Sequence, residues 1–422
     1  MHLSSRSCAA AVASLVLMAA CQRGGPGSSP GTSSLDSPRR LPTGRSLDPA
    51  GISASLGSMP LAMTLSPDGR KVLVLLNGYR EQGVQVVDRS TGRVDQTLVQ
   101  AAAFLGIAFS PDGRTLYASG GNQDVVYRYA WRDDHATLTD SLVLAVKRGA
   151  NGTRYPGGVA PSPDGRLLYV AENLADSLAV VDLASARVVQ RVATERWPYG
   201  VVVARNGTVY VSAWGGSTVS VFTPATPAPL ASAARIRVGR HPSAVLLSAD
   251  DSRLFVASAS TDRVAVVDTR QRRVLTEIFD SPPGGPGEGS TPSALALSSD
   301  GTRLFVAESD NNAIALVDLA PGTSGIAAAT GEDRIAGRVP TQWYPTAVIA
   351  RGDTLLALTG KGQGTAPNPR GPRPGRERAD TGFDVRQYTL GQTSGTLVTS
   401  LLARIAGPGL AALSARVARA NL

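Results

Sequence analysis

The sequence predicts an all-β fold, a seven-bladed β-propeller, and three observations lead to it. One pattern recurs seven times in the 422 residues, each copy reads as a set of short strands, and the N-terminal segment can supply a strand that the last copy lacks. The copies begin at Pro60, Phe104, Pro156, Pro198, Pro242, Pro292 and Pro345. Their spacings of 44, 52, 42, 44, 50 and 53 residues lie within or slightly above the roughly 40 to 50 residues of a four-stranded blade.

The stretch Ser162–Val192, SPDGRLLYVAENLADSLAVVDLASARVVQRV, illustrates one copy. Its segments LLYVA, SLAVVD and RVVQRV are short, rich in β-branched residues and separated by Gly, Asp, Asn or Ser, which is typical of consecutive antiparallel strands. The first two are apolar at consecutive positions, and this pattern indicates a sheet that is covered on both faces. A lone sheet of this size is marginal in water, so the copies are expected to pack against one another as blades.

The SPDG turns before the second strand of three copies follow from local chemistry. Proline sets the backbone of the second turn position, aspartate tolerates the tight geometry, and glycine takes the left-handed conformation. Asp68, Asp112 and Asp164 are therefore predicted to be turn residues rather than metal ligands or catalytic acids.

The seventh copy indicates how the ring closes. A long loop, GKGQGTAPNPRGPRPGRERADTGF from Gly360, separates its second strand from the next strand-like segment, GTLVTSLL at Gly395–Leu402, and no convincing fourth strand follows. The segment PTGRSLDPAG at Pro42 matches the turn and fourth strand of the first blade, STGRVDQTL at Ser90. We therefore expect residues 42–49 to form the outer strand of the last blade, which would leave the ring without an open edge.

The ends of the chain predict export and anchoring. Residues 1–20 hold one Arg and a short apolar run that ends Met-Ala-Ala before Cys21, which is typical of a bacterial lipoprotein signal peptide. Cys21 is the expected lipidation site, residues 21–40 a disordered tether, residues 41–405 the propeller and residues 406–422 a helical connector. The chain would then lie on the periplasmic side of the bacterial outer membrane. The alternative is ordinary signal cleavage with Cys21 unmodified.

Composition argues against zinc chemistry and leaves nucleic acid as a weaker alternative. The chain has only Cys8 and Cys21 as cysteines and three histidines, so a zinc site is not expected, and we expect no cofactor. The formal net charge is +9, but most arginines fall in predicted turns, where they favour a dispersed solvated surface. The one dense basic cluster lies in the loop of the seventh copy and consists of Lys361, Arg370, Arg373, Arg376 and Arg378.

Strand direction predicts a ligand face. The loops that join the fourth strand of one blade to the first of the next (D–A loops) share a face with the loops that join the second strand to the third (B–C loops). The D–A loops supply Tyr155, Trp197, His241 and Tyr344, and the B–C loops supply Asn77, Asn122, Glu172, Asn173, Trp214, Asp310, Asn311 and Lys361. Concave mouths with aromatic walls and a few polar groups are the usual place for a ligand. The alternative is that the aromatic residues cap blade packing and the asparagines hold tight loops.

Catalytic signals are sparse. Glu172 and Glu308 occupy equivalent positions in the third and sixth copies, nearly opposite each other in the ring, and we expect them to be too distant to act as a pair. The segment GKGQG lacks the spacing of a phosphate-binding P-loop, although Lys361 within it could bind an anion. No catalytic residue is assigned.

The repeats, LYVAENLADSLAVVD above all, resemble the YVTN repeat of extracytoplasmic propellers of the YncE family and, more distantly, lactonase-type seven-bladed propellers. The resemblance covers residues 41–405. Three segments, LPTGRSLDPAG at Leu41, FSPDGRTLYASGGNQDVVYRY at Phe109 and GKGQGTAPNPRGP at Gly360, resemble proteins in which a YncE-like propeller precedes an alkaline-phosphatase-superfamily phosphoesterase domain. The sequence stops at Leu422, where that domain would begin, so its nucleophile and metal ligands have no counterpart here. The resemblance implies a phosphoesterase that is encoded separately or has been lost by truncation.

Three functions follow from the sequence. The first is a monomeric, non-catalytic propeller that binds a ligand or scaffolds a partner in the cell envelope, either that phosphoesterase or another envelope protein. The second is a lactonase-type hydrolase, which would need carboxylates and a divalent cation at the mouth, and the third is nucleic-acid binding through the basic loop. The spacing of Leu410, Leu413 and Val417 predicts an apolar stripe on the last helix, which we expect to need a partner.

Overall fold

The computed structural model describes residues 39–41, 44, 46–79, 81–147, 149, 151–320, 333–364, 393–405 and 407–421. Every described residue belongs to one compact unit. The predicted signal peptide, Cys21 and the four arginines Arg370, Arg373, Arg376 and Arg378 lie outside the described residues.

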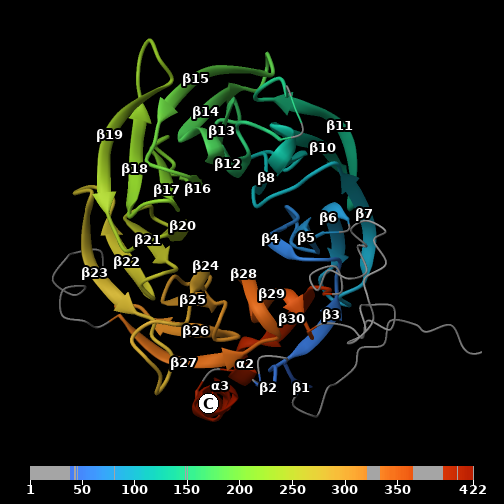
Figure 1. Ribbon diagram of the computed structural model, residues 1–422, viewed down its shortest axis with the longest axis vertical. Coiled ribbons are helices and arrows are strands. Elements are labelled where there is room, and N and C mark those ends of the chain that lie inside the picture. Colours follow the sequence, from blue (N-terminus) through green and yellow to red (C-terminus); the bar gives the residue numbers. More distant parts are fainter. Residues whose placement is uncertain are drawn as a thin grey trace, which may run out of the picture. The chain divides into compact units, whose positions relative to one another are not determined.

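This unit is a seven-bladed β-propeller, as the repeats predict (Figure 1). Each blade is a four-stranded antiparallel sheet whose first strand lies nearest the centre of the ring. Blades one to three consist of β4 (Pro60–Leu65), β5 (Lys71–Asn77), β6 (Gln82–Asp88) and β7 (Val94–Gln100); β8 (Ile107–Phe109), β9 (Thr115–Ser119), β10 (Val125–Arg132) and β11 (His135–Val143); and β12 (Pro156–Pro161), β13 (Leu167–Glu172), β14 (Ser177–Asp182) and β15 (Arg187–Ala193). Short 3-10 turns, η1 (Gly121–Gln123) and η2 (Asn173–Ala175), lie in the B–C loops of blades two and three.

The remaining blades follow the same order around the ring. Blades four to six consist of β16 (Pro198–Val203), β17 (Val209–Ala213), β18 (Thr218–Pro224) and β19 (Leu230–Arg237); β20 (Pro242–Leu247), β21 (Arg253–Ser258), β22 (Arg263–Asp268) and β23 (Arg273–Phe279); and β24 (Pro292–Leu297), β25 (Arg303–Glu308), β26 (Ala313–Asp318) and β27 (Arg334–Pro340). Blade seven consists of β28 (Trp343–Arg351), β29 (Thr354–Gly362), β30 (Thr396–Leu401) and β3 (Ile52–Ser55).

Adjacent blades pack through the continuous apolar runs of their second and third strands. Leu73 and Val84 of blade one, for example, share a cluster with Leu116 and Tyr129 of blade two, and all four side chains are fully or almost fully buried. This two-sided burial explains why these strands lack the alternation of a half-exposed sheet.

Hydroxyl groups join the inner strands of neighbouring blades. The Oγ atoms of Ser243 and Ser293 donate to the carbonyls of Pro292 and Pro345 in the next blade, at 2.7 and 3.1 Å. Across the closure of the ring, Thr346 Oγ1 donates to the Pro60 carbonyl at 2.8 Å. These bonds tie the sheets together near the loop face.

The turn residues take the predicted roles. Asp68 Oδ1 accepts hydrogen bonds from Ser66 Oγ at 2.6 Å and from the Arg70 amide at 3.0 Å. Asp112 and Asp164 accept equivalent bonds within their own turns. The glycines that follow these three aspartates have φ values of 75°, 71° and 70°, the left-handed conformation that glycine adopts without strain.

The N-terminal segment closes the last blade, but the strand lies later than the sequence predicts. β3 (Ile52–Ser55) pairs with β30, and Ile52 lies opposite Thr399. Gly51 precedes it at φ 124°, where a side chain would meet the Thr399 carbonyl oxygen. The predicted outer strand over residues 42–49 is therefore wrong, although the three-plus-one closure is confirmed.

The segment before β3 has a different partner, which explains the error. Ser46–Leu47 forms β2 and pairs with β1 (Arg39–Arg40), at the end of the stretch predicted as tether. Leu47 is only 2% exposed, and Asp48 forms an ion pair with Arg416 Nε at 2.7 Å. The TGR sequence matches that of blade one, but the residues after it pair with β1 and contact the last helix instead of joining blade seven.

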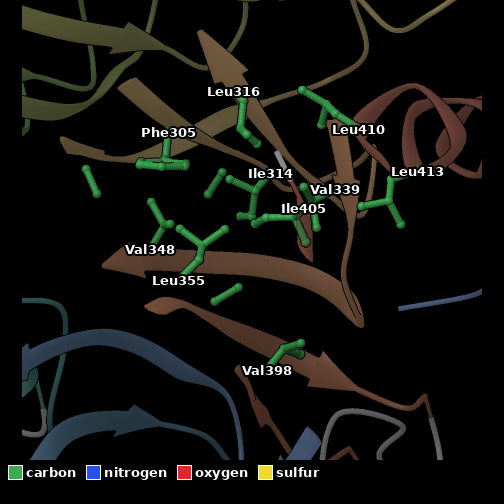
Figure 2. Packing of buried hydrophobic residues seen from close by; sticks show 13 residues of the cluster. Phe305, Ile314, Leu316, Val339, Val348, Leu355, Val398, Ile405, Leu410 and Leu413 are labelled. Atoms are coloured by element: carbon green, nitrogen blue, oxygen red, sulfur yellow. The ribbon is translucent and has the colours of Figure 1, made fainter. Parts of the chain in front are cut away.

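The C-terminal helices cover the edge of blade six. β30 continues into α2 (Leu402–Ile405), and α3 (Pro408–Asn421) follows. Leu410, Leu413 and Val417 are 6%, 9% and 1% exposed, and Figure 2 shows the first two beside Val339 of β27. The apolar stripe predicted for this helix is present, but the expectation that it needs another protein is wrong, because the propeller itself covers it.

Two contacts fix α3 against the outer strand β27. Ser414 Oγ accepts a hydrogen bond from the Arg338 amide at 2.8 Å, so the helix satisfies a donor that an edge strand would leave open. Gly337 gives the helix room to approach, since a Cβ atom there would lie 2.5 Å from Leu410 Cγ.

Candidate functional site

The D–A loops of six blades end in the same unusual backbone conformation. The residue directly before a proline at or near the start of the first strand has a positive φ of between 48° and 65° in each. These residues are Met59, Tyr155, Trp197, His241, Thr291 and Tyr344. Positive φ is uncommon outside glycine and costs about 1 to 3 kcal/mol when it is strained, so its recurrence with six different side chains indicates that the loop geometry is built in.

A polar residue at the end of each B–C loop holds this conformation in four blades. Asp124 Oδ1 accepts the Tyr155 amide at 2.9 Å, and Asp176 Oδ1 accepts the Trp197 amide at 2.8 Å. Asp262 and Asn312 accept the amides of Thr291 and Tyr344 in the same way, each at 2.9 Å. The acceptors themselves have positive φ. This set was missed from the sequence; an alignment of the copies at the residue before the third strand would have revealed it.

The same acceptors carry further backbone bonds where the loops are long. Asp262 is 1% exposed and also accepts from the amides of Gly289 and Ser290. Burial alone would raise the pKa of Asp124, but bonds from the amides of Thr153, Tyr155 and Arg154 outweigh burial and lower it. The carboxylates at these positions are therefore structural.

Aromatic rings gather where blades two, three and four meet. The Phe104 ring lies edge-on to Tyr155, with centroids 5.1 Å apart, and edge-on to Tyr199 at 5.7 Å. Burial, with a smaller effect of Tyr344, raises the pKa of Tyr199 to about 12, so its hydroxyl stays protonated at neutral pH. Phe104 and Tyr199 were not predicted, because their contact joins different blades and no pattern within one copy indicates it.

A stack of rings lies across blades four and five. The Trp197 and Trp214 centroids are 5.7 Å apart at 30°, and Trp214 stacks on His241 at 4.8 Å and 21°. Arg196 covers Trp197 at 5.1 Å from its centroid. Trp197 and Trp214 remain 37% and 38% exposed, so three of the predicted ligand residues are brought together and two present exposed indole rings to solvent.

A lysine occupies the aromatic surface of blade seven. Lys361 Nζ lies 4.1 Å from the Tyr344 centroid and 5.0 Å from the Trp343 centroid. Burial lowers the pKa of Lys361, and the negative charge of Asp310 opposes this shift. Asp310 also accepts a hydrogen bond from Thr291 Oγ1 at 2.7 Å. Lys361, Asp310 and Tyr344 thus bring together a cation, an anion and an aromatic ring.

The predicted asparagines hold neighbouring loops. Asn77 Nδ2 donates to the Ala103 carbonyl, Asn122 Oδ1 accepts the Gly152 amide at 2.6 Å, and Asn173 Nδ2 donates to the Pro198 carbonyl at 3.1 Å. The first two bonds join B–C to D–A loops and the third reaches the first residue of β16, which places both sets of loops on one face, as strand direction predicts. Asn311 is 2% exposed and donates to Glu308.

The two equivalent glutamates are fully buried in ion pairs beneath this face. Glu172 forms a bidentate pair with Arg191, with Nε–Oε2 and Nη2–Oε1 distances of 2.9 and 3.0 Å. Glu308 pairs with Arg338 Nε at 2.7 Å. Each arginine also donates to a carbonyl of the preceding blade, of Leu144 and Ser281 respectively. Both carboxylates are neutralised by arginine and do not fit a divalent cation.

Neither a metal-binding cluster nor a membrane-spanning helix is found among the described residues. In that part of the chain no cluster of three or more His, Cys, Asp or Glu side chains is placed to hold a metal ion. No helix within the described ranges is long and apolar enough to cross a membrane.

Comparisons with known proteins support the propeller. Residues 141–260 match the family model described as the SMP-30/gluconolactonase/LRE-like region. No curated protein matches the chain. A catalytically inactive virginiamycin B lyase from Staphylococcus aureus, solved with quinupristin, is 13% identical with a TM-score of 0.56, over 82% of this chain and 98% of that one.

Two further solved structures have the same fold. The periplasmic gluconolactonase of Pseudomonas aeruginosa is 20% identical with a TM-score of 0.53, over 67% of this chain and 85% of that one. The WD40 repeats of RRP9 are 12% identical with a TM-score of 0.60, over 84% and 99%. Identities this low establish the fold alone.

Proposed function

We propose that this chain is a cell-envelope lipoprotein whose propeller binds a ligand through the loop face, without catalysis of its own. The observation that carries the proposal is the ring of positive-φ residues, in which a repeated backbone presents side chains that differ from blade to blade. Strained, over-determined backbone is typical of functional sites. Exposed Trp197 and Trp214 beside His241 give the face flat apolar surfaces that can stack on a ring-shaped ligand.

Anchoring rests on the sequence. Lipidation of Cys21 would hold the propeller on the periplasmic side of the outer membrane, with residues up to Pro38 as the tether. A Cys21→Ser variant is expected to lose membrane association in cell fractionation; fractionation like the unmodified chain would contradict this part of the proposal.

The partner proposed from the sequence resemblance is a phosphoesterase of the alkaline-phosphatase superfamily or another envelope protein. Since the stripe of α3 is covered by blade six, such a partner would dock on the loop face or through the loop that follows Lys361. The YncE-like relationship itself rests on the quoted repeats. Nucleic-acid binding is the alternative that the arginines of that loop favour.

A lactonase-type hydrolase is the second candidate, because the gluconolactonase-like family model matches residues 141–260, a range that includes Tyr155, Trp197, Trp214 and His241. The described residues do not supply the free carboxylates that a divalent cation would require. Faster hydrolysis of gluconolactone than in buffer, dependent on added calcium or magnesium and abolished by a substitution on the loop face, would favour this candidate over a binding module.

Calorimetric titration tests the loop face directly. The probes are gluconolactone for the lactonase candidate, a single-stranded oligonucleotide for nucleic-acid binding, and quinupristin as a larger ring-shaped ligand. We expect one of them to bind the full chain and Trp214→Ala to weaken that binding about tenfold, since stacking on an aromatic ring contributes about 1 to 3 kcal/mol. Leu174→Ala, an exposed apolar residue of η2, is the control and should bind normally. Equal binding by both variants, or no binding of any probe, would contradict the proposal.

A further inference from the structure

A hollow lies on the face opposite the loop face of the propeller, between blades four and five. The turns after β16, β20 and β22 enclose a groove of about 1120 Å³. It is lined by Ala204, Arg205, Asn206, Thr208, Tyr210, Asp250, Asp251, Ser252, Asp268, Thr269, Arg270, Gln271 and Arg272. None of these residues belongs to the loop face.

The three carboxylates of the groove accept hydrogen bonds from their own turn or from the turn of the neighbouring blade. Asp250 accepts bonds from the hydroxyls of Ser248 and Ser252, which lower its pKa to about 2. Asp251 Oδ2 accepts the Arg205 amide at 2.8 Å. Asp268 Oδ1 accepts the amides of Arg270 and Gln271 at 2.8 and 2.7 Å. The groove therefore holds three carboxylates and three arginines, and none of these carboxylates forms an ion pair with one of these arginines.

The three arginines, by contrast, have no carboxylate partner among the described residues. Arg205, Arg270 and Arg272 are all exposed. The one hydrogen bond that the structure gives to any of their guanidinium groups is from Arg272 Nη1 to the Ala233 carbonyl, at 3.4 Å. Arginine presents several N–H donors in a planar fork that fits the oxygens of an anion.

Buried Tyr210 adds a polar group to the same groove. Its ring is packed between blades and the residue is only 2% exposed, yet it lines the hollow. None of the residues that the structure describes forms a hydrogen bond with its hydroxyl. Burial raises the pKa of Tyr210, with Arg272 opposing this shift, so the hydroxyl is protonated at neutral pH and can donate.

The backbone conformation of Arg272 is a further indication that its side chain has a role in the groove. Arg272 has a φ of 54° and its amide donates to the Asp268 carbonyl at 2.8 Å. In blade one the same turn position is Gly92, whose amide bonds Asp88 in the same way and whose φ is 72°. A long side chain thus occupies a position where glycine is the unstrained residue.

A smaller hollow on the same face, between blades one and two, has its cations in direct ion pairs. It has a volume of about 430 Å³ and includes Lys71, Arg93 and Asp95. Lys71 Nζ lies 2.8 Å from both Asp88 and Asp95, and Arg93 Nε lies 2.8 Å from Asp95. There the cations are neutralised by the protein itself.

We propose that the groove between blades four and five binds the phosphate group of a small ligand. Arg205, Arg270 and Arg272 provide the positive charge, and the Tyr210 hydroxyl donates from the floor. A phosphate monoester carries more acceptor oxygens than a carboxylate and so matches a site that offers several forks and one hydroxyl. The phosphate can belong to a soluble ester or to a lipid headgroup.

Calorimetric titration of the full chain at constant ionic strength tests this. The probes are glycerol 3-phosphate, acetate, and vesicles of phosphatidylcholine with and without phosphatidic acid. Arg272→Gly is the main variant, because glycine is compatible with the left-handed backbone and the fold should be retained. We expect it to weaken phosphate binding about tenfold, the effect of losing one charge-assisted contact. Tyr210→Phe should weaken it by a smaller factor.

Arg93→Gln is the control, since it removes an arginine from the neutralised hollow on the same face and should leave binding unchanged. Loss of glycerol 3-phosphate binding in Arg272→Gly supports a soluble ester, and loss of binding to phosphatidic acid vesicles alone supports a lipid headgroup. Binding that is equal in the unmodified chain, Arg272→Gly and Arg93→Gln would overturn the proposal. So would acetate binding as tightly as glycerol 3-phosphate.

Discussion

The two faces of the propeller use repetition in different ways. On the turn face, five blades repeat both the residues and the bonds: a serine hydroxyl donates to an aspartate two positions later, at 2.5 to 2.6 Å. On the loop face, six blades repeat the backbone, at φ values of 48° to 65°, while the side chain there changes from Met59 to Tyr155, Trp197, His241, Thr291 and Tyr344.

This difference between the two faces distinguishes residues that serve folding from residues that are available for function. Residues and bonds that recur together are explained by folding, since the same turn must be made in each blade. A backbone that recurs while its side chains diverge provides a fixed scaffold for a variable surface. The substitutions below test this division in order of expected effect.

The largest loss of stability is expected at the buried glutamate–arginine pairs that join neighbouring blades beneath the loop face. Arg338→Met leaves Glu308 and Asp280 buried beside each other without a cation, which should lower the free energy of unfolding by about 3 to 5 kcal/mol. Arg191→Met should cost less, because the Arg191 side chain is 34% exposed and Leu144 stands where blade five has Asp280. Urea denaturation measures both; an equal loss in the two variants would show that Asp280 is unimportant.

The next largest effect is expected at the acceptors of the loop face. Asp262→Ala removes three backbone hydrogen bonds from a residue that is 1% exposed, and a loss of about 3 kcal/mol follows if each buried amide costs about 1 kcal/mol. Asp164→Ala on the turn face, measured in the same denaturant series, should cost about 1 kcal/mol. The reverse order would contradict the view that the loop geometry is held by these acceptors.

Asp280 predicts a dependence of stability on pH. Burial, and then the charge of Glu308, raise the pKa of Asp280 well above its ordinary value. A carboxyl whose folded pKa is raised stabilises the fold fully below its unfolded pKa, and this contribution is lost as pH rises through the folded pKa. Asp280→Asn can donate to Glu308 at any pH, so its unfolding free energy should decline less than that of the unmodified chain as pH is raised above the ordinary range of an aspartate. If the unfolding free energies of the two proteins declined in parallel with pH, a raised pKa of Asp280 would be contradicted.

The turn aspartates predict the opposite slope in acid. The Ser66 hydroxyl and the Arg70 amide lower the pKa of Asp68 to about 2. Its contribution is present above the unfolded pKa of 3.8 and is lost as pH falls toward 2. Asp68→Asn should therefore lose about 1 kcal/mol at neutral pH and show a flatter acid limb in thermal unfolding scans. A steeper limb would be inconsistent with this role.

A structural feature could be predicted from the sequence where the interactions that form it are local in the chain. The seven blades and the SPDG turns could be predicted, because strand pattern and turn chemistry act within one copy. The three-plus-one closure could be predicted because the last copy lacks a fourth strand. The outer strand of blade seven was misplaced by several residues, since Ser46–Leu47 pairs with Arg39–Arg40 and packs under α3, contacts that no local pattern reveals.

The candidate site was only partly predictable for the same reason. Trp197, Trp214 and His241 were identified from their loops and lie in one stack. Phe104 and Tyr199 were missed because their contact joins blade two to blade four. The Asp and Asn acceptors were missed because each one bonds an amide at least 21 positions further along the chain.

The smallest effect on stability is expected on the variable surface itself. Trp214 is 38% exposed, and Trp214→Phe keeps an aromatic ring between Trp197 and His241, so the unfolding free energy should fall by less than about 1 kcal/mol. A loss of several kcal/mol would mean that the ring is part of the blade packing, as the structural alternative for these aromatic residues holds.

The most direct test of the division between the faces is to measure unfolding free energy and probe binding on the same two variants, Trp214→Ala of the loop face and Asp164→Ala of the turn face. The account predicts opposite outcomes for binding: Trp214→Ala binds the gluconolactone, quinupristin or oligonucleotide probe about tenfold more weakly, whereas Asp164→Ala loses about 1 kcal/mol of stability and binds that probe as the unmodified chain does. Unchanged binding in Trp214→Ala, or binding weakened as much in Asp164→Ala, would contradict it.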